Sequence, residues 1–364
     1  MRAQLCALLF SALAPAFAFA QVADTEKLLP QRLLQLVHTP EVQAELKLTP
    51  GKQAALEKLL TKLDAVWLPS RNLSPDEMRT TVAGLEEQVR QWVVANLSKQ
   101  QARRLHQLEC QAQGVRAMLR EAMGKRLELS PEQINGFLTR AQATEAVQEE
   151  LRQAQQSGSP TEEIQTRLKE TVAAEQAALA EALTPQQHEA MWKLLGEPFD
   201  TSKLTRIYPL APEFVRVDDW INSKPLTLKS FRGKVVLVHF YAFQCHNCHA
   251  NFDIYKRWHD ELAEKGVVLI GIQTPETSSE RDPKLVKAAA AERGLEFPIL
   301  VDLESKNWAA WGNTMWPTVY VVDKNGYIRS WWMGELNWQG ATGDKSIEEM
   351  VEVALAEAGP EEKS

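Results

Sequence analysis

Residues 24–198 have the hydrophobic spacing of amphipathic helices. Apolar side chains recur three and four positions apart, and Gln, Glu, Ala, Leu and Arg, which favour helices, dominate the composition of this segment. Two apolar stripes are clear: Leu56, Leu59, Leu60, Leu63 and Trp67, then Leu85, Val89, Trp92 and Val93. We therefore expect an all-α domain over 24–198, with six or seven helices joined by short turns.

A helix-start signal repeats along this segment. Leu followed by Ser or Thr, with Glu or Gln three residues after the hydroxyl, begins at Leu73, Leu97, Leu129 and Leu183. The hydroxyl can cap the helix, and the later side chain can bond back to the cap. The spacing of the copies is irregular, which argues against a solenoid. Capping alone explains them, but they also resemble the LTxxQ motif of small helical periplasmic chaperones, which implies a domain that binds proteins.

The pattern changes near residue 199. Residues 199–212 are rich in Pro and polar residues and are typical of a linker. Beyond the linker we expect strands at 234–243, 267–274, 297–302 and 317–335, the last a hairpin turning at Asn325-Gly326, and helices at 250–266, 282–294 and 344–359. This alternation predicts an α/β domain over 213–358, with a mixed central sheet covered by helices on both faces, and a short tail at 359–364.

The N-terminus predicts export. One Arg precedes an apolar run that ends in Ala18-Phe19-Ala20, which is the pattern of a secretory signal peptide cleaved near Ala20. A membrane anchor is the alternative, but the run is short and contains Pro15. Cys6 would leave with the signal peptide. We therefore expect a periplasmic protein in an oxidising compartment.

Composition narrows the possible partners only slightly. The chain has 364 residues, of which 44% are hydrophobic and 24% charged, as in ordinary globular proteins. The formal net charge of -7 argues against a nucleic-acid partner, because phosphate binding needs a basic surface. Four cysteines are too few for a disulfide-stapled scaffold. One of them, Cys110, lies in an apolar helical stripe, where we expect it to be buried.

The chemistry-bearing stretch is Cys245-His246-Asn247-Cys248, followed by His249. Two thiols at this spacing can cycle to a disulfide, whereas Cys-x-x-Cys-His is also the attachment motif of a c-type haem. The two chemistries exclude each other, since haem attachment would consume both sulfurs. The motif follows a strongly apolar strand, which favours the dithiol. A metal site would need further ligands, which only His246 and His249 could supply nearby.

The two thiols are expected to differ. Cys245 follows a strand and stands at a helix start, where unpaired backbone N–H groups favour an anion, so its pKa should fall below the usual value of roughly 8.5. Cys248 lies one turn later on the same helix face. We therefore expect Cys245 to be the exposed, attacking thiol and Cys248 the buried, resolving thiol.

As a set, several phrases resemble the thioredoxin fold, and within it the exported TlpA-like or redoxin branch. The resemblance covers residues 209–358 and is closest to the periplasmic domain of DipZ-type electron-transfer proteins. The phrases are "APEF" (211–214), "FRGKVVLVHFYAF" (231–243), "GVVLIGIQTPE" (266–276), "FPILVD" (297–302) and "WPTVYVVDKNGYI" (316–328). The resemblance implies a thiol-disulfide oxidoreductase that uses no separate cofactor. Its partners would be protein thiols and disulfides, together with a redox partner that recharges the dithiol.

The resemblance also implies roles for single residues. Pro317 matches the cis-proline that faces the cysteines, an uncommon geometry at about 5–6% of X-Pro bonds. Trp316, before it, would expose its backbone to pair with a substrate strand and so hold the target disulfide against Cys245. Glu276 matches an acidic residue that helps to move protons near the dithiol. Pro317 could instead be an ordinary strand-entry proline, and Glu276 a plain loop carboxylate.

Other positions depart from the family pattern. His239 stands six residues before the first Cys, where thioredoxins have a buried Asp, and it is either a core histidine or a proton acceptor for Cys248. Gln244 and Tyr241 differ from common family residues, which leaves the substrate preference open. His246 could stabilise the thiolate and raise the reduction potential above thioredoxin's value of roughly −270 mV, or it could simply be solvated.

A different class of function stays open at this point. The helical half could hold unfolded or partner proteins while the thioredoxin-like half serves as a redox-inactive recognition module, making the protein a chaperone or an adaptor. Both cysteines are present, however, and disulfide exchange with protein substrates through Cys245 and Cys248 is the function that the sequence favours.

Overall fold

The chain forms two compact units. The computed structural model describes residues 25, 27–157, 159–205, 209–215 and 219–360. One unit, here called the helical unit, comprises Met1–Leu36 and Leu97–Ser202; the other, called the sheet unit, comprises Val37–Asn96 and Lys203–Ser364. The expected signal peptide over 1–20, with its cleavage site near Ala20 and Cys6, lies outside the described residues.

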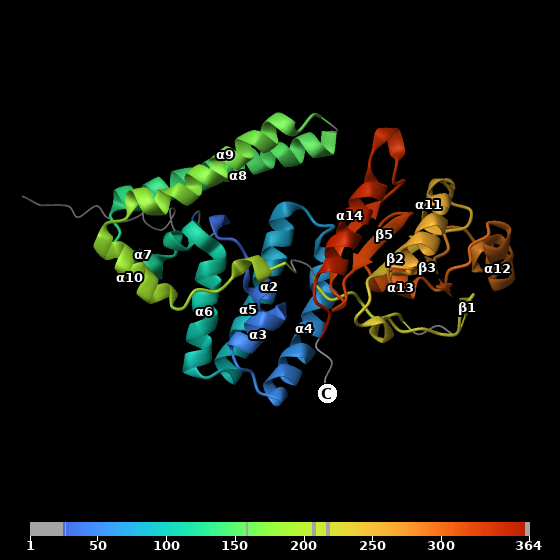
Figure 1. Ribbon diagram of the computed structural model, residues 1–364, viewed down its shortest axis with the longest axis horizontal. Coiled ribbons are helices and arrows are strands. Elements are labelled where there is room, and N and C mark those ends of the chain that lie inside the picture. The colour runs from blue at the N-terminus through green and yellow to red at the C-terminus, as the bar shows by residue number, and fades with distance from the viewer. Residues whose placement is uncertain (1–24, 26, 158, 206–208, 216–218, 361–364) are drawn as a thin grey trace, which may run out of the picture. The chain divides into compact units, whose positions relative to one another are not determined.

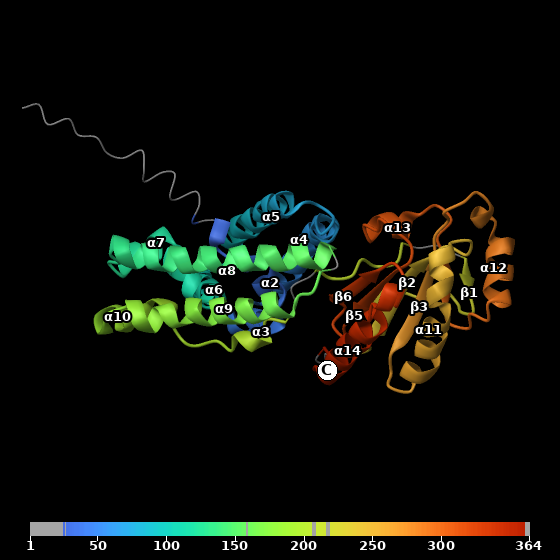
Figure 2. The ribbon, with the colours of Figure 1, turned by 90° about the horizontal axis from the view of Figure 1, so that it is seen from above.

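The helical unit is built from helices on both sides of a 3-10 turn. Its elements are the start of α2 (Leu33–His38), α6 (Lys99–Gln113), η1 (Gly114–Leu119), α7 (Glu121–Arg126), α8 (Pro131–Ser157), α9 (Glu162–Ala182) and α10 (Pro185–Leu195). The long helices α8 and α9 run side by side (Figures 1 and 2). Cys110 is buried in the core of this unit, as expected, together with Phe137 and Met191.

The repeated start signals act as helix caps. Ser98 with Gln101 and Thr184 with Gln187 form capping boxes at α6 and α10, and the same reciprocal hydrogen bonds join Ser130 to Gln133 before α8. The copy at Leu73 also caps, because Ser74 and Glu77 bond each other before α5 (Pro75–Asn96). The capping interpretation therefore accounts for all four copies.

The structure has more helices than the spacing predicts. Within residues 24–198, α2 to α10 alone are nine α-helices, including α3 (Pro40–Glu45) and α4 (Pro50–Ser70), rather than six or seven. The extra ones, α2, α3 and α7, each span about one and a half turns. Helices this short cannot display a repeating apolar stripe, and tertiary packing stabilises them instead.

The sheet unit contains a mixed six-stranded sheet, which confirms the expected α/β architecture. The strands are β1 (Trp220–Ile221), β2 (Val236–Tyr241), β3 (Val268–Gln273), β4 (Ile299–Val301), β5 (Thr318–Val322) and β6 (Ile328–Met333), in the order β1-β4-β3-β2-β5-β6. The central strands β2, β3 and β4 are parallel, whereas β5 and β6 are antiparallel to their neighbours. All residues of β2 are buried, as its continuous apolar run indicates.

Helices cover both faces of this sheet. On one face, α11 (His246–Ala263), α12 (Pro283–Glu292) and α14 (Gly343–Ala356) pack against a core that includes Leu237 and Val319. Figure 1 shows α11 and α14 along this side. On the other face, α13 (Lys306–Ala310) and the end of α4 pack against Val236 and Tyr320. Alternate residues of each strand thus enter different cores, as the period of two requires.

An N-terminal segment belongs to the sheet unit. Helices α3, α4 and α5 group with it, so the compact units do not follow the expected division into domains at 24–198 and 213–358. Leu68 of α4 joins the same core as Trp311, and the Tyr327 hydroxyl donates to the carbonyl of His38 at 2.8 Å. The end of the expected linker over 199–212 also contacts the sheet unit, since the Ala211 amide donates to the carbonyl oxygen of Gly326 at 2.9 Å. Those domain limits stay a prediction about which parts fold independently.

No helix among the described residues combines the length and the apolar character needed to cross a membrane.

Candidate active site

Three loops meet at one edge of the sheet. β2 ends at Tyr241, four residues before Cys245, and Phe240 pairs with Thr318 at the start of β5. The amide of Thr274, which follows β3, donates to Tyr241 at 2.9 Å. The loop after β2, the loop after β3 and the loop before β5 therefore lie together. They carry the dithiol, Glu276 and the Trp316–Pro317 bond, which is cis as the resemblance implies.

Cys245 occupies the N-cap position of α11 with an extended backbone. The pKa of its thiol is lowered, first by a hydrogen bond from the Cys248 thiol and then by the backbone N–H groups of Cys248 and Asn247; burial and the charge of Glu276 act in the opposite direction. The side chain is only 8% exposed, which is less than we expect from the sequence. It is nevertheless more accessible than Cys248, whose side chain is 0% exposed.

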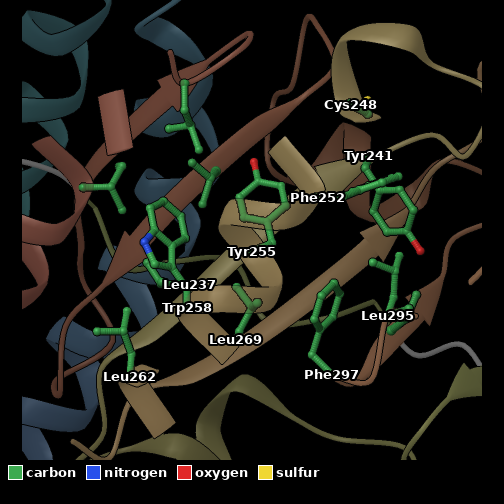
Figure 3. Close-up of a cluster of buried hydrophobic side chains, with 14 of the residues drawn as sticks. Leu237, Tyr241, Cys248, Phe252, Tyr255, Trp258, Leu262, Leu269, Leu295 and Phe297 are labelled. Atoms are coloured by element: carbon green, nitrogen blue, oxygen red, sulfur yellow. The ribbon is translucent and has the colours of Figure 1, made fainter. Parts of the chain in front are cut away.

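Cys248 lies one helical turn further on and is fully buried. Burial is the largest cause that raises the pKa of its thiol, and the nearby charges of Cys245 and Glu276 add to it. Figure 3 shows Cys248 at one end of the apolar cluster, next to Tyr241 and Phe252. Both cysteines are free thiols in this structure. Because the pKa of Cys248 is raised and that of Cys245 is lowered, Cys245 loses its proton first.

His249 has a structural task that the sequence does not reveal. Its Nε2 lies 2.6 Å from the carbonyl oxygen of Phe243, so that nitrogen must carry the proton and donate. Its Nδ1 is left to accept from Arg293, 3.4 Å away. The ring thus ties the first turn of α11 to the end of β2. Service as a haem ligand would require breaking this bond, which favours the dithiol interpretation of the motif.

Glu280 is a site residue that sequence reasoning missed. Its carboxylate is fully buried and accepts from the amides of Gln244 (2.7 Å), Glu276 (2.7 Å) and Thr277 (2.8 Å). The Gln244 side chain adds hydrogen bonds from the hydroxyls of Thr277 and Ser279. Glu280 therefore joins the residue before Cys245 to the loop that carries Glu276. Its only signal in the sequence is an acid four residues after Glu276, which looks like any surface carboxylate.

His239 is a neutral core side chain. It is fully buried, stacks on Tyr255 with ring centroids 4.1 Å apart, and has no hydrogen-bond partner at either ring nitrogen among the described residues. Burial lowers its pKa to about 3. Gly271 leaves room for the ring, because a Cβ there would lie 3.0 Å from its Nε2. These contacts favour the core-histidine alternative; a role in accepting the Cys248 proton stays a prediction.

The remaining predicted side chains lie around the dithiol. Trp316 is half-buried and stacks on Trp308 with centroids 4.0 Å apart. Glu276 is exposed, yet close enough to both sulfurs for its charge to raise their pKa values. His246 is exposed and is not among the causes that act on the pKa of Cys245, so its proposed effect on the reduction potential stays a prediction.

Comparison with known proteins finds relatives that match part of this chain. The model of the AhpC/TSA family matches residues 209–331. DipZ of Mycobacterium tuberculosis is 34% identical over 154 residues, which are 41% of this chain and 21% of DipZ. Thiol-disulfide oxidoreductase ResA of Bacillus anthracis is 30% identical over 125 residues, 34% of this chain and 68% of ResA. A crystal structure of the thioredoxin-like superfamily protein SPOA0173 is 25% identical, with a TM-score of 0.38, over 42% of this chain and 99% of that one.

The chain belongs to the TlpA-like family of thioredoxin-fold proteins. The residues that the family model matches, 209–331, lie in the sheet unit. The chain spans about a fifth of the length of DipZ, at 21%. The dithiol, the loop with the cis Trp316–Pro317 bond and the loop with Glu276 lie together in the sheet unit, and the roles that the resemblance implies for their residues stay predictions.

Replacing Glu280 with Ala tests its role in holding the two loops together. Three backbone amides would lose their buried acceptor, so we expect the free energy of unfolding of the variant to fall by about 2–4 kcal/mol. Chemical denaturation of the full chain measures it. Glu292, an exposed carboxylate at the end of α12, is the matched control, and its change to Ala should leave stability nearly unaltered. Equal losses for the two variants would contradict the assignment.

The rate at which iodoacetamide alkylates Cys245 reports its thiolate. In the reduced wild type we expect the rate to rise with pH and to level off below the range of a free cysteine, roughly 8.5. Glu276→Gln removes a negative charge that raises the pKa of Cys245, so its profile should shift to lower pH. Cys248→Ala removes a hydrogen-bond donor and should shift the profile to higher pH. Peptide mapping assigns the alkylated residue, and shifts of the opposite sign would refute the electrostatic account.

His239 should make the protein sensitive to acid. Its pKa is about 3 when folded and about 6.5 when unfolded, so the unfolded chain binds more protons between these values. The free energy of unfolding should therefore fall as the pH drops below about 6.5, by up to about 1.4 kcal/mol per pH unit from this group. Denaturation of His239→Leu between these pH values should show a flatter dependence than the wild type.

Gln273 supplies the control for this measurement. It is also fully buried with its amide atoms unpartnered among the described residues, but it does not titrate. Gln273→Leu should therefore change stability without changing its pH dependence. If the His239 and Gln273 variants show the same slope against pH, the His239 imidazole is not the titrating group.

Proposed function

We propose that this protein exchanges disulfides with other proteins through Cys245 and Cys248. The observation that carries the proposal is the unequal environment of the two sulfurs at the start of α11. The Cys245 thiol has a lowered pKa and can be reached, whereas the Cys248 thiol has a raised pKa and is enclosed. A reaction in two steps needs this inequality, because one sulfur must attack and the other must wait.

The proposed reaction balances without a cofactor. The Cys245 thiolate attacks one sulfur of a substrate disulfide, forming a mixed disulfide and releasing the other substrate sulfur as a thiolate. Cys248 then loses its proton and attacks Cys245, which forms the Cys245–Cys248 disulfide and frees the second substrate thiol. The substrate disulfide is reduced and the dithiol is oxidised by the same two electrons. Run backwards, the same steps oxidise a substrate dithiol.

The second step requires a proton to leave Cys248. Glu276 is suited to carry it, because its charge acts on both sulfurs and its exposed carboxylate can exchange protons with water. His239 is less suited, since its protonated form is disfavoured by burial. We assign proton transfer to Glu276 and leave His239 as packing beneath the site.

The loop before β5 supplies the substrate contact. β5 begins at Thr318, so the backbone of Trp316 lies before the first residue of that strand and is placed to pair with an extended substrate segment. Substrates would then be proteins with accessible disulfides or dithiols, and a second redox protein would restore the starting state of the dithiol. We also propose that the protein works after export, in an oxidising compartment where such substrates are found.

Reduction of insulin disulfides in the presence of dithiothreitol tests the proposed activity. The reduced wild type should accelerate the precipitation of insulin chains, and Cys245→Ser should reduce the rate to that of dithiothreitol alone, because the attacking sulfur is gone. Oxidation of a reduced peptide by the disulfide form tests the reverse direction. A wild type that accelerates neither reaction would show that the domain is a recognition module and not an oxidoreductase.

The same chemistry predicts a trapped intermediate. Cys248→Ala leaves Cys245 able to attack but removes the sulfur that resolves the mixed disulfide, so covalent adducts with substrate should accumulate and disappear on reduction. Cys110, which is buried in the helical unit, supplies the matched control. The double variant Cys110→Ala/Cys248→Ala should still form the adducts, because Cys245 is unchanged. Adducts that require Cys110 would place the reactive sulfur elsewhere.

A further inference from the structure

Arg71 lies at the turn between α4 and α5, within the sheet unit. Its Nη2 donates to the carbonyl oxygens of Trp311 (2.8 Å) and Gly312 (3.1 Å) and to the hydroxyl of Tyr320 (2.6 Å). Its Nη1 donates to the carbonyl of Leu68 at the end of α4. The guanidinium therefore joins its own helix to a segment some 240 residues away in the sequence.

The surroundings of Arg71 make this a closely fitted contact. The guanidinium carbon lies 5.6 Å from the ring centre of Tyr320 and 5.5 Å from that of Trp331, within cation–π range. Gly312 has a φ of +59°, and a Cβ on it would lie 3.2 Å from Pro69. A side chain here would be strained at this φ and tight against Pro69, so glycine favours the close approach of the helix end and the loop.

Arg71 contacts residues at the start of the loop at 311–317 and a residue just after its end. Trp311 and Gly312 begin this loop, and Tyr320 lies in β5 just beyond its end. Burial raises the pKa of Tyr320 to about 12, although the neighbouring Arg71 acts to lower it, so the phenol keeps its proton and donates to Oδ1 of Asn313 at 2.6 Å. One guanidinium thus reaches the start of the loop directly and its middle through the Tyr320 hydroxyl.

The loop at 311–317 ends in Trp316 and Pro317, the segment that the proposed function assigns to substrate pairing. We propose that Arg71 is a positioning residue for this reaction: it fixes the loop so that the backbone of Trp316 presents the substrate disulfide to Cys245. This inference rests on the proposed function. It makes the helical segment at 37–96, which lies outside the family resemblance, part of the substrate-binding apparatus.

A second contact of the same segment supplies a control. The Tyr327 hydroxyl donates to the carbonyl of His38 at 2.8 Å and thereby also attaches residues 37–96 to the sheet. Tyr327 precedes β6. The first residue of β6, Ile328, pairs with Val322, the last residue of β5, whereas the loop at 311–317 leads into the first residue of β5, Thr318. Loss of this bond would weaken the attachment without touching the loop at 311–317.

The experiment compares Arg71→Ala, Arg71→Lys and Tyr327→Phe in the full-length chain. For each variant it measures kcat and KM for a protein disulfide, the alkylation rate of Cys245 by iodoacetamide, and the melting temperature. For Arg71→Ala we expect kcat/KM to fall about tenfold or more while the alkylation rate stays at the wild-type value, because the loop and not the dithiol is displaced. Arg71→Lys, which keeps the charge without the planar fork, should show an intermediate loss.

Several results would overturn the inference. Wild-type kcat/KM in Arg71→Ala would do so, as would equal losses in Arg71→Ala and Tyr327→Phe, which would assign the effect to attachment of the segment in general. A parallel fall in Cys245 alkylation would assign it to the dithiol. If Arg71→Ala does not fold, Asn72→Ala takes its place, since the Asn72 amide donates to the same Gly312 carbonyl at 2.8 Å. If the wild type itself is inactive, the proposed function fails. The other outcomes all require an active wild type, so the two kinds of failure can be told apart.

Discussion

The candidate site depends most on the hydrogen bonds that the Cys245 sulfur receives at the first turn of α11. A thiolate at this position receives backbone N–H groups that no helical carbonyl can satisfy, together with the Cys248 thiol. The same turn brings Cys248 within reach but leaves it enclosed by the apolar cluster around Tyr241 and Phe252. One helical turn therefore yields two thiols whose pKa values are shifted in opposite directions.

The loops around the dithiol are held by polar side chains from neighbouring elements. Glu280 gathers three amides from the loops after β2 and β3. His249 joins α11 to the carbonyl of Phe243, just after β2, by a hydrogen bond. Arg71 donates hydrogen bonds to the loop before β5. Each of these side chains forms hydrogen bonds with backbone groups of a loop, which favours one shape for that loop. The geometry of the candidate site thus follows from hydrogen-bond satisfaction at the sheet edge.

The attachment of residues 37–96 changes how the chain is divided. Helical composition groups these residues with the rest of the N-terminal half, but Leu68 packs into the core on the face of the sheet that α13 also contacts, and Arg71 donates to the carbonyl of Trp311. The thioredoxin-like domain in this protein is consequently enlarged by a helical segment that arrives from the other end of the sequence. The helical unit, by contrast, is held by its own core and by its capped helices.

The sequence by itself determined the elements and the reactive pair. Apolar runs rich in β-forming residues predicted the principal strands, and apolar residues three and four positions apart predicted the longer helices. Cys-x-x-Cys after a buried strand predicted a dithiol at a helix start. These signals are local. The tertiary structure alone decided that Cys245 is nearly enclosed, that Glu280 and His249 brace the loops, that His239 is an unpartnered core imidazole, and that Arg71 reaches Trp311. These facts depend on contacts between distant segments, and no local spacing encodes which buried polar group will meet which loop.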